Sequence, residues 1–173
     1  MSAPADLVNN SAIYGVNSNT YIIPYGAVVE LYISNHDSNS HPFHLHGHQF
    51  QVVDRAGGGL YFPGFLAPNP ATPMRRDVVM VYGSGYTVIR FVADNPGIAL
   101  FHCHIEWHVE AGLIATFIEA PDVLQAMALS LPDSHTAACV SQGIPITGNA
   151  AGNSNDWLDL TGANTEPPLN AWG

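Results

Sequence analysis

The chain has 173 residues, of which 47% are hydrophobic, so it can bury the core of one domain with some additional chain. Fourteen acidic residues stand against four basic ones, and the formal net charge of −10 argues against a nucleic-acid partner, whose phosphates need a basic surface. The absence of an apolar run of about 18 residues predicts that this chain has no membrane span.

Five segments in chain order have the composition of β-strands, with β-branched and aromatic side chains and, in several, alternating apolar and polar positions. They are Val28–Ser34, Gln49–Asp54, Asp77–Tyr82, Tyr86–Val92 and Leu113–Ala120. Turn-forming clusters separate them, at Ala56–Gly59, Pro68–Pro73, Gly83–Gly85 and Asp94–Gly97. Short strands at this spacing predict an all-β antiparallel sandwich or barrel.

Helical signals are few and lie toward the C-terminal end. Pro121–Leu131 begins with a proline and has apolar residues at helical spacing, and a shorter turn is predicted at Ile105–Ala111. Beyond about residue 140 the chain is rich in glycine, asparagine and proline, which predicts an extended tail that can lie on a neighbour. We therefore expect an N-terminal segment at 1–13, one domain at 14–131 and a C-terminal extension at 132–173.

Two short segments, HPFHLHGH at 41–48 and FHCHIEWH at 101–108, contain most of the histidines and one of the two cysteines. If HCH is a strand, His102 and His104 point to one face and Cys103 points to the other. His44 and His46 share a face in the same way. Pairing of the two segments in a sheet therefore predicts a group of four imidazoles that forms half of a metal cage.

A second metal site is predicted on the other side of the strand. A tight turn after Cys103 can bring His108 back beside the sulfur, and His41 before Pro42 can supply another imidazole. One cysteine with two histidines is the ligand set of blue electron-transfer copper, although H-x-H patterns also bind zinc in tetrahedral sites. Burying this many imidazoles without partners would cost about 1–3 kcal/mol each, which favours a metal role.

The two motifs resemble the copper-binding signature of the C-terminal cupredoxin domain of fungal-type multicopper oxidases, the laccase and ferroxidase family. The resemblance extends from Tyr14 to Cys139 and includes PMRRDVV and RFVADNPG. It implies a cupredoxin-like Greek-key β-sandwich with one or two short helices. It also implies the copper ligands, which are His41, Cys103 and His108 for type 1 copper, His44 for type 2 copper, and His46, His102 and His104 for type 3 copper. Leu113 matches the axial position of the type 1 copper, where a leucine cannot ligate.

The resemblance implies an oxidase that relays electrons. A donor, either a phenol or Fe(II), would give single electrons through His108 to the type 1 copper, and Cys103 would pass them to His102 and His104 at a three-copper cluster that reduces O₂ to water. The family cluster takes eight histidines and this chain supplies four, so N-terminal cupredoxin domains or self-association would supply the others. The alternative is a non-enzymatic blue-copper carrier or metal-binding module, which leaves open whether this chain is active alone.

Three further residue types bear on function. Asp37 matches an acidic position that fungal ferroxidases use to bind Fe(II), although NHDSNS also predicts an Asx turn there. Glu106 and Glu110 are candidates for proton delivery or ordinary solvated acids. Cys139 has no partner in the chain if Cys103 binds copper, which suggests pairing outside it.

Polar loops and the triplet Asn9-Asn10-Ser11 favour an extracellular or cell-surface location.

Overall fold

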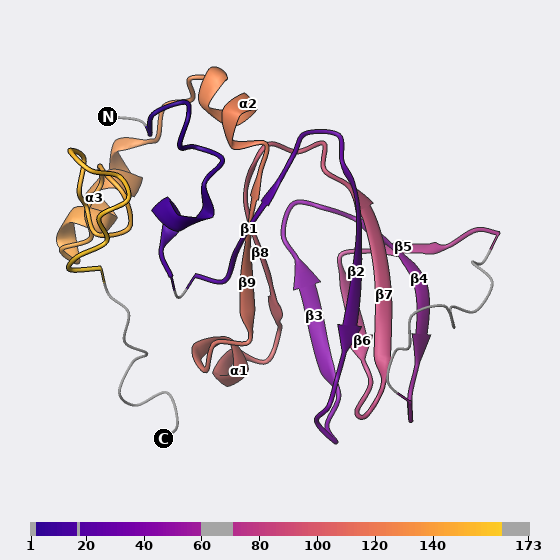
Figure 1. Cartoon of the computed structure of the whole chain (residues 1–173). Helices are drawn as coiled ribbons and strands as arrows, with labels where there is room; N and C mark the ends of the chain where they lie inside the picture. Colours follow the sequence, from indigo (N-terminus) through magenta and orange to yellow (C-terminus); the bar gives the residue numbers. More distant parts are fainter. Residues whose placement is uncertain (1–2, 17, 60–70, 164–173) are drawn as a thin grey trace.

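A computed structural model describes residues 3–16, 18–59 and 71–163. Within these ranges, strands form two layers (Figure 1). One sheet has the order β1 (Thr20–Ile23), β9 (Ile114–Glu119), β8 (Gly97–Cys103), β3 (His41–Leu45) and β6 (Val78–Val81). The other has the order β2 (Val28–Ser34), β7 (Tyr86–Val92), β4 (Phe50–Ala56) and β5 (Met74–Arg76). The two-sheet sandwich predicted from the sequence is confirmed.

The core lies between the sheets and is built from the alternating apolar positions of their strands. Phe50 on β4, Leu45 on β3 and Ile89 on β7 are 0% exposed. Aromatic rings continue this core across β8 and β9, where Phe101 stacks on Phe117 with ring centroids 5.7 Å apart. Each such buried side chain contributes about 1.5–3 kcal/mol relative to its exposed state, so the core provides a rigid support for residues at the strand ends.

The strand pairing differs from the prediction at one edge. β1 was not predicted, and it pairs in parallel with β9, with Thr20 opposite Thr116. The sandwich is therefore mixed rather than purely antiparallel. Four residues are too few for a clear alternation pattern, so β1 becomes a strand because β9 offers it a partner. β5 was also not predicted, and residues 68–70 of the expected Pro68–Pro73 turn lie outside the described residues.

The helices are short and only partly match the prediction. They are the 3₁₀ helix η1 (Ser11–Tyr14), α1 (Glu106–Glu110), α2 (Pro121–Ala126) and α3 (Asp133–Ser141). α1 occupies the predicted turn, whereas α2 ends before Leu131 and is followed by Ala128 in the left-handed region with φ 49°. α3 was not predicted. No helix in the described part of the chain is long and apolar enough to cross a bilayer.

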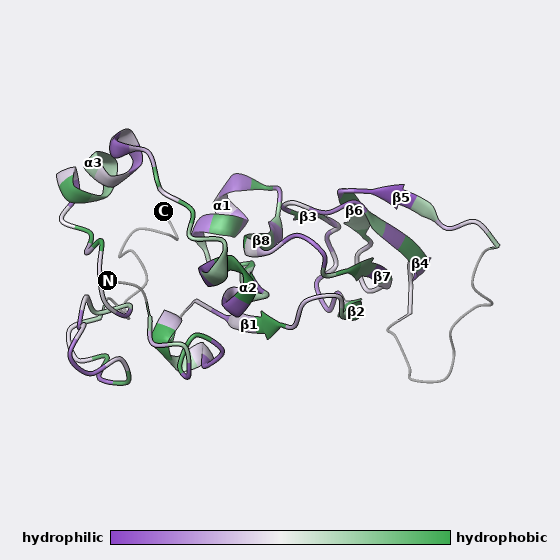
Figure 2. Ribbon diagram, turned by 90° about the horizontal axis from the view of Figure 1, so that it is seen from above, coloured by the Kyte–Doolittle hydropathy of each residue, from purple (hydrophilic) through white to green (hydrophobic). Residues whose placement is uncertain are grey.

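The tail after α3 is folded rather than extended. It turns around the buried Asn149, and the backbone N–H of Ala150 donates to the carbonyl of Ile13 at 3.1 Å. Figures 1 and 2 show α3 and the tail at the end of the molecule away from β4 and β5, which is also the end where the N-terminal segment lies. Up to residue 163, the tail therefore packs on the N-terminal segment of its own chain.

Candidate metal centre

Strand pairing brings the two histidine-rich segments side by side. β3 and β8 are antiparallel neighbours, with Phe43 opposite Cys103 and His44 opposite His102. Successive side chains of a strand point to opposite faces, so Cys103 lies on the core side of the sheet and His102 on the outer side. Cys103 is 0% exposed, whereas His102 is only partly buried. The pleat thus separates neighbouring residues into two sites.

The first site contains the sulfur of Cys103 and two imidazoles. Its Sγ lies 3.5 Å from Nδ1 of His108 and 3.8 Å from Nδ1 of His41, and the two Nδ1 atoms are 3.1 Å apart. These three atoms all lie within 4.8 Å of one another, so they could hold a metal ion. One thiolate with two imidazole nitrogens suits copper. The donor chemistry of the residues present therefore fits that metal.

α1 returns His108 to the cysteine. The helix begins at Glu106, shortly after β8 ends at Cys103, and its last turn is closed by the N–H of Leu113, which donates to the carbonyl of His108 at 2.9 Å. The N–H of Cys103 in turn donates to the carbonyl of Leu113 at 3.1 Å. Two backbone hydrogen bonds thus fix the positions of the cysteine and the histidine relative to each other.

The second site is a group of four histidines on the outer face of the same sheet. Ring centroids are 4.8 Å apart for His44 and His46, 5.0 Å for His46 and His102, and 5.8 Å for His102 and His104. His44 lies 5.9 Å from His104, which closes the group. All four side chains are partly or fully exposed. The group is therefore an open half-cage, as the sequence predicts.

Hydrogen bonds and a lowered pKa leave ring nitrogens in this group that could serve as metal ligands. Nδ1–H of His44 donates to the carbonyl of Asp77 at 2.9 Å, and Nδ1–H of His102 donates to the carbonyl of Cys103 at 2.8 Å. Such bonds leave the other ring nitrogen free as a ligand. Burial lowers the pKa of His46 below 6.5, and the neighbouring imidazoles lower it further. His46 therefore stays neutral, with a free lone pair, to a lower pH than an ordinary histidine.

The chain matches a known protein family over most of its length. A sequence model of the family described as Multicopper oxidase matches residues 1–123. The chain belongs to the multicopper oxidase family. The iron transport multicopper oxidase fetC of Epichloe festucae is 47% identical over 176 residues, covering 96% of this chain and 28% of fetC. The iron transport multicopper oxidase fio1 of Schizosaccharomyces pombe is 49% identical over 156 residues, covering 89% of this chain and 25% of fio1.

Solved structures agree with the family and with its fold. The crystal structure of Fet3p, a multicopper oxidase that functions in iron import, has 42% identity and a TM-score of 0.82, and the match covers 93% of this chain and 32% of Fet3p. A laccase from Botrytis aclada has 30% identity and a TM-score of 0.59, covering 73% of this chain and 24% of the laccase. The predicted cupredoxin-like fold is confirmed. This multicopper oxidase chain spans about a third or less of the length of these proteins, and copper is the cofactor of the family.

Asp37 contacts the sulfur site of this multicopper oxidase chain from outside. Its Oδ2 lies 3.0 Å from Nε2 of His41, and its Oδ1 accepts from the backbone N–H of Asn39 at 3.1 Å. The N–H of Asn39 and the ring of His41 lower the pKa of the Asp37 carboxyl below 3.8, so the group is negative over a wide pH range. The carboxylate is 47% exposed. Asp37 therefore closes an Asx turn and also presents a charge beside His41.

The other predicted residues contribute no side-chain contact to either site in the described part of the chain. Glu106 and Glu110 are exposed on α1, and no hydrogen bond joins either of them to a histidine in the described ranges. Leu113 lines a cavity of about 370 Å³ with His41 and Asp37, and offers no donor atom. Cys139 is a free cysteine on α3, and its pairing outside the chain stays a prediction.

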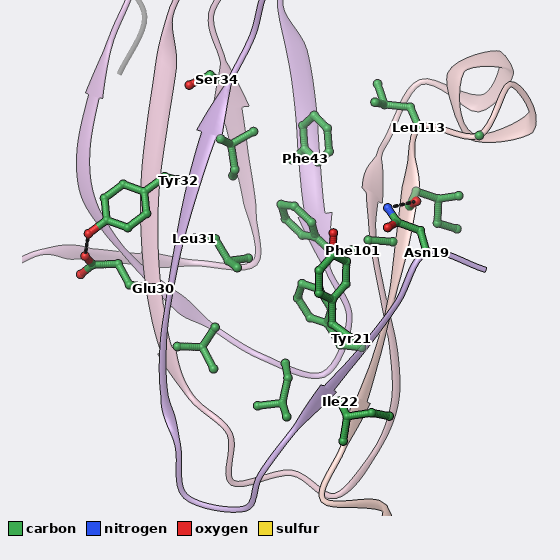
Figure 3. A pocket seen from close by; sticks show the side chains of 17 residues that line it. Asn19, Tyr21, Ile22, Glu30, Leu31, Tyr32, Ser34, Phe43, Phe101 and Leu113 are labelled. Carbon is green, nitrogen blue, oxygen red and sulfur yellow. Dashed lines mark hydrogen bonds between the residues drawn. The ribbon is translucent and has the colours of Figure 1, made fainter. Parts of the chain in front are cut away.

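A larger cavity of about 640 Å³ opens between β1 and β2 (Figure 3). Figure 3 shows that Leu31, Phe43 and Phe101 point into it from both sheets, and Leu113 lies at one side. Its lining is mainly apolar and contains no histidine or cysteine. None of the candidate ligands in the two histidine sites lines this cavity.

Sequence reasoning missed one group of residues near the four histidines. His48 ends the HPFHLHGH motif, but its ring turns away from the cluster and lies 2.6 Å from a carboxyl oxygen of Glu119. No local signal identifies Glu119, because it ends a strand as many surface acids do.

Proposed function

We propose that this chain is the domain of a multicopper oxidase that receives single electrons at a type 1 copper and supplies half the ligands of the cluster that reduces O₂ to water. The observation that carries the proposal is the opposed placement of the two sites on β8. Cys103 belongs to the buried site, and the adjoining His102 and His104 belong to the open one. A few covalent bonds therefore connect the two sites.

The type 1 ligands would be His41, Cys103 and His108. Copper held by two imidazoles and a thiolate supplies a one-electron redox centre. Leu113 offers no fourth ligand, so the oxidised metal is less stabilised and a high reduction potential is expected. The partial exposure of His108 leaves an edge through which a donor can approach.

The four outer histidines would be cluster ligands, with His44 on type 2 copper and His46, His102 and His104 on type 3 copper. The open face of the half-cage supports this role, because the remaining ligands must come from outside it. N-terminal cupredoxin domains of a longer protein are the proposed source, with self-association as the alternative. His102 also bonds to the carbonyl of Cys103, which adds a second connection between the sites.

Fe(II) is the proposed donor, and a phenol is the laccase-type alternative. Two observations favour iron. The relatives fetC and fio1 are named as iron transport multicopper oxidases. Asp37 places a negative carboxylate against His41, where it would attract Fe²⁺ and stabilise the Fe³⁺ product. This function suits an extracellular or cell-surface protein.

A second candidate is a stand-alone blue-copper carrier, since the sulfur site is complete within the chain and the histidine cluster is half a cage. Reconstitution with copper, followed by metal counting and O₂ uptake with Fe(II) and with a phenol, tests both functions. We expect an intense blue colour with about one tightly bound copper per isolated chain. We also expect O₂ uptake, faster with Fe(II), only when the partner domains are present. A colourless protein that binds zinc in preference to copper would reject the type 1 assignment, whereas blue colour with no O₂ uptake in the longer protein would support the carrier.

A further inference from the structure

Glu119 is a buried acid that the proposed chemistry does not use. It is the last residue of β9 and is 1% exposed. Its Oε2 lies 2.6 Å from Nε2 of His48, and its Oε1 accepts from the backbone N–H of Asn95 at 2.5 Å. A buried carboxyl group is costly without partners, and both of its oxygens have one here. The sequence thus places an acid where an apolar side chain would fill the core.

The same group of residues holds the turn that follows β3. The side-chain amide of Asn95 donates to the carbonyl of Gly47 at 3.1 Å. Gly47 has φ 76°, and a Cβ there would come within 2.9 Å of that amide nitrogen. The ring of His48 packs on the ring of Phe91, with the ring centroids 4.8 Å apart. Glu119 therefore fixes Gly47 through Asn95 and fixes His48 directly.

His46 immediately precedes Gly47 and His48, the two residues that Glu119 holds in place. Its N–H donates to the carbonyl of Leu100 at 2.9 Å, and its Nε2 lies 2.9 Å from Nε2 of His102. β3 ends at Leu45, so strand pairing no longer holds the backbone after His46. Beyond His46, the backbone is held instead by the contacts of Glu119 with His48 and Asn95.

We propose that Glu119 is a positioning residue that fixes the turn at residues 46–48 and thereby holds His46 against His102. The importance of this placement for copper rests on the proposed function, but the placement itself does not. It is a property of the metal-free chain and can be measured there.

The test is solution NMR of the metal-free chain. In Glu119→Ala we expect amide hydrogen exchange at His46, whose N–H donates to the carbonyl of Leu100, to rise at least about tenfold, because local opening of the turn becomes easier. Cross-relaxation between the His46 and His102 rings should weaken as well. The contact between the His41 and His108 rings, 4.8 Å apart in the structure, should be unchanged.

Three further variants separate positioning from general stability. Glu119→Gln keeps an acceptor for the Asn95 N–H and should restore part of the protection. Ile118→Val, at a 2% exposed neighbour on the same strand, loosens core packing and should lower the melting temperature without raising exchange at the turn. Asn95→Ala alters an exposed side chain and removes only the link to Gly47, so it tests the proposal even if Glu119→Ala does not fold.

Two results would overturn the proposal. One is unchanged exchange and unchanged ring contacts at the turn in Glu119→Ala, or in Asn95→Ala where the first variant does not fold. The other is an equal rise in exchange in Ile118→Val, which would reduce Glu119 to a general support of the sandwich. Because no copper is added, failure of the copper assignment would not alter either result.

Discussion

Cys103 is the residue on which the proposed electron path depends. It is fully buried, and its sulfur faces two imidazole nitrogens at 3.5 and 3.8 Å. Its neighbours His102 and His104 lie on the opposite face of the sheet. One side chain therefore belongs to the buried site while its own backbone leads to the open one.

The variant Cys103→Ser should lose the intense blue colour after copper reconstitution, because the thiolate is the source of the charge-transfer band. The fold should survive, at a cost of about 1–3 kcal/mol for a poorly satisfied buried hydroxyl. Visible absorption and far-ultraviolet circular dichroism measure the two effects. Cys139→Ser is the matched control and should stay blue, and retained colour in Cys103→Ser would contradict the ligand assignment.

Asp37→Ala should separate the two candidate donors. Its carboxylate touches His41 and is partly exposed, so its removal takes away a negative charge that a cation would meet. In the longer protein that carries this domain, kcat/KM for Fe(II) should fall several-fold, while kcat/KM for a phenol changes little. Equal losses for both donors would remove the ferroxidase assignment.

At the level of elements, the pairing of β3 with β8 creates both candidate metal sites at once. The register places Phe43 opposite Cys103 and His44 opposite His102. A shift of one residue would turn every side chain of β3 to the other face, which would separate the four imidazoles. The register is held by apolar residues on the core side, among them Leu45 and Phe101.

The pairing of β2 with β7 includes an ion pair that should respond to pH. The Glu30 carboxylate accepts from Nε of Arg90 at 2.7 Å and from the hydroxyl of Tyr32. The Tyr32 hydroxyl, followed by Arg90, lowers the pKa of Glu30 below 4.5 in the folded state. The contribution to stability is therefore present above pH 4.5 and is lost as pH falls through the folded-state pKa.

Glu30→Gln should lower the free energy of unfolding at pH 7 by at most about 1 kcal/mol, since both partners are partly exposed. The gap between the variant and the parent chain should be smaller at pH 3 than at pH 7, because the contribution of the carboxylate is lost as the pH falls below 4.5. Thermal unfolding of both proteins at the two pH values measures this difference, and an equal gap at both would show that the carboxylate charge contributes nothing.

At the level of the whole molecule, the sandwich and the C-terminal extension are stabilised in different ways. The sandwich has a core of apolar side chains, whereas the tail depends on polar contacts around Asn149, which is 7% exposed. The Asn149 amide group donates to the carbonyls of Trp157 and Asp159 at 3.1 and 2.7 Å and accepts from two backbone N–H groups. One side chain thus organises most of the tail.

Asn149→Ala should therefore release the tail and leave the sandwich folded. Leaving the backbone groups without partners costs about 1–3 kcal/mol locally, and limited proteolysis should cut between residues 145 and 161 much faster than in the parent chain. Asn155→Ala, at an exposed position of the same loop, is the control and should not change cleavage. Unchanged cleavage in Asn149→Ala would show that other contacts hold the tail.

The sequence by itself determined the chemistry and the local geometry of the sites. Alternation along HCH and HLH follows from the backbone, so neighbouring residues had to face opposite sides once the segments were strands. Only the tertiary structure decided which distant groups meet: β1 beside β9, Glu119 against His48, and Ala150 on Ile13. These contacts, most of them between residues far apart in the chain, depend on how elements pack and not on the pattern within any one of them, which is why no local signal could predict them.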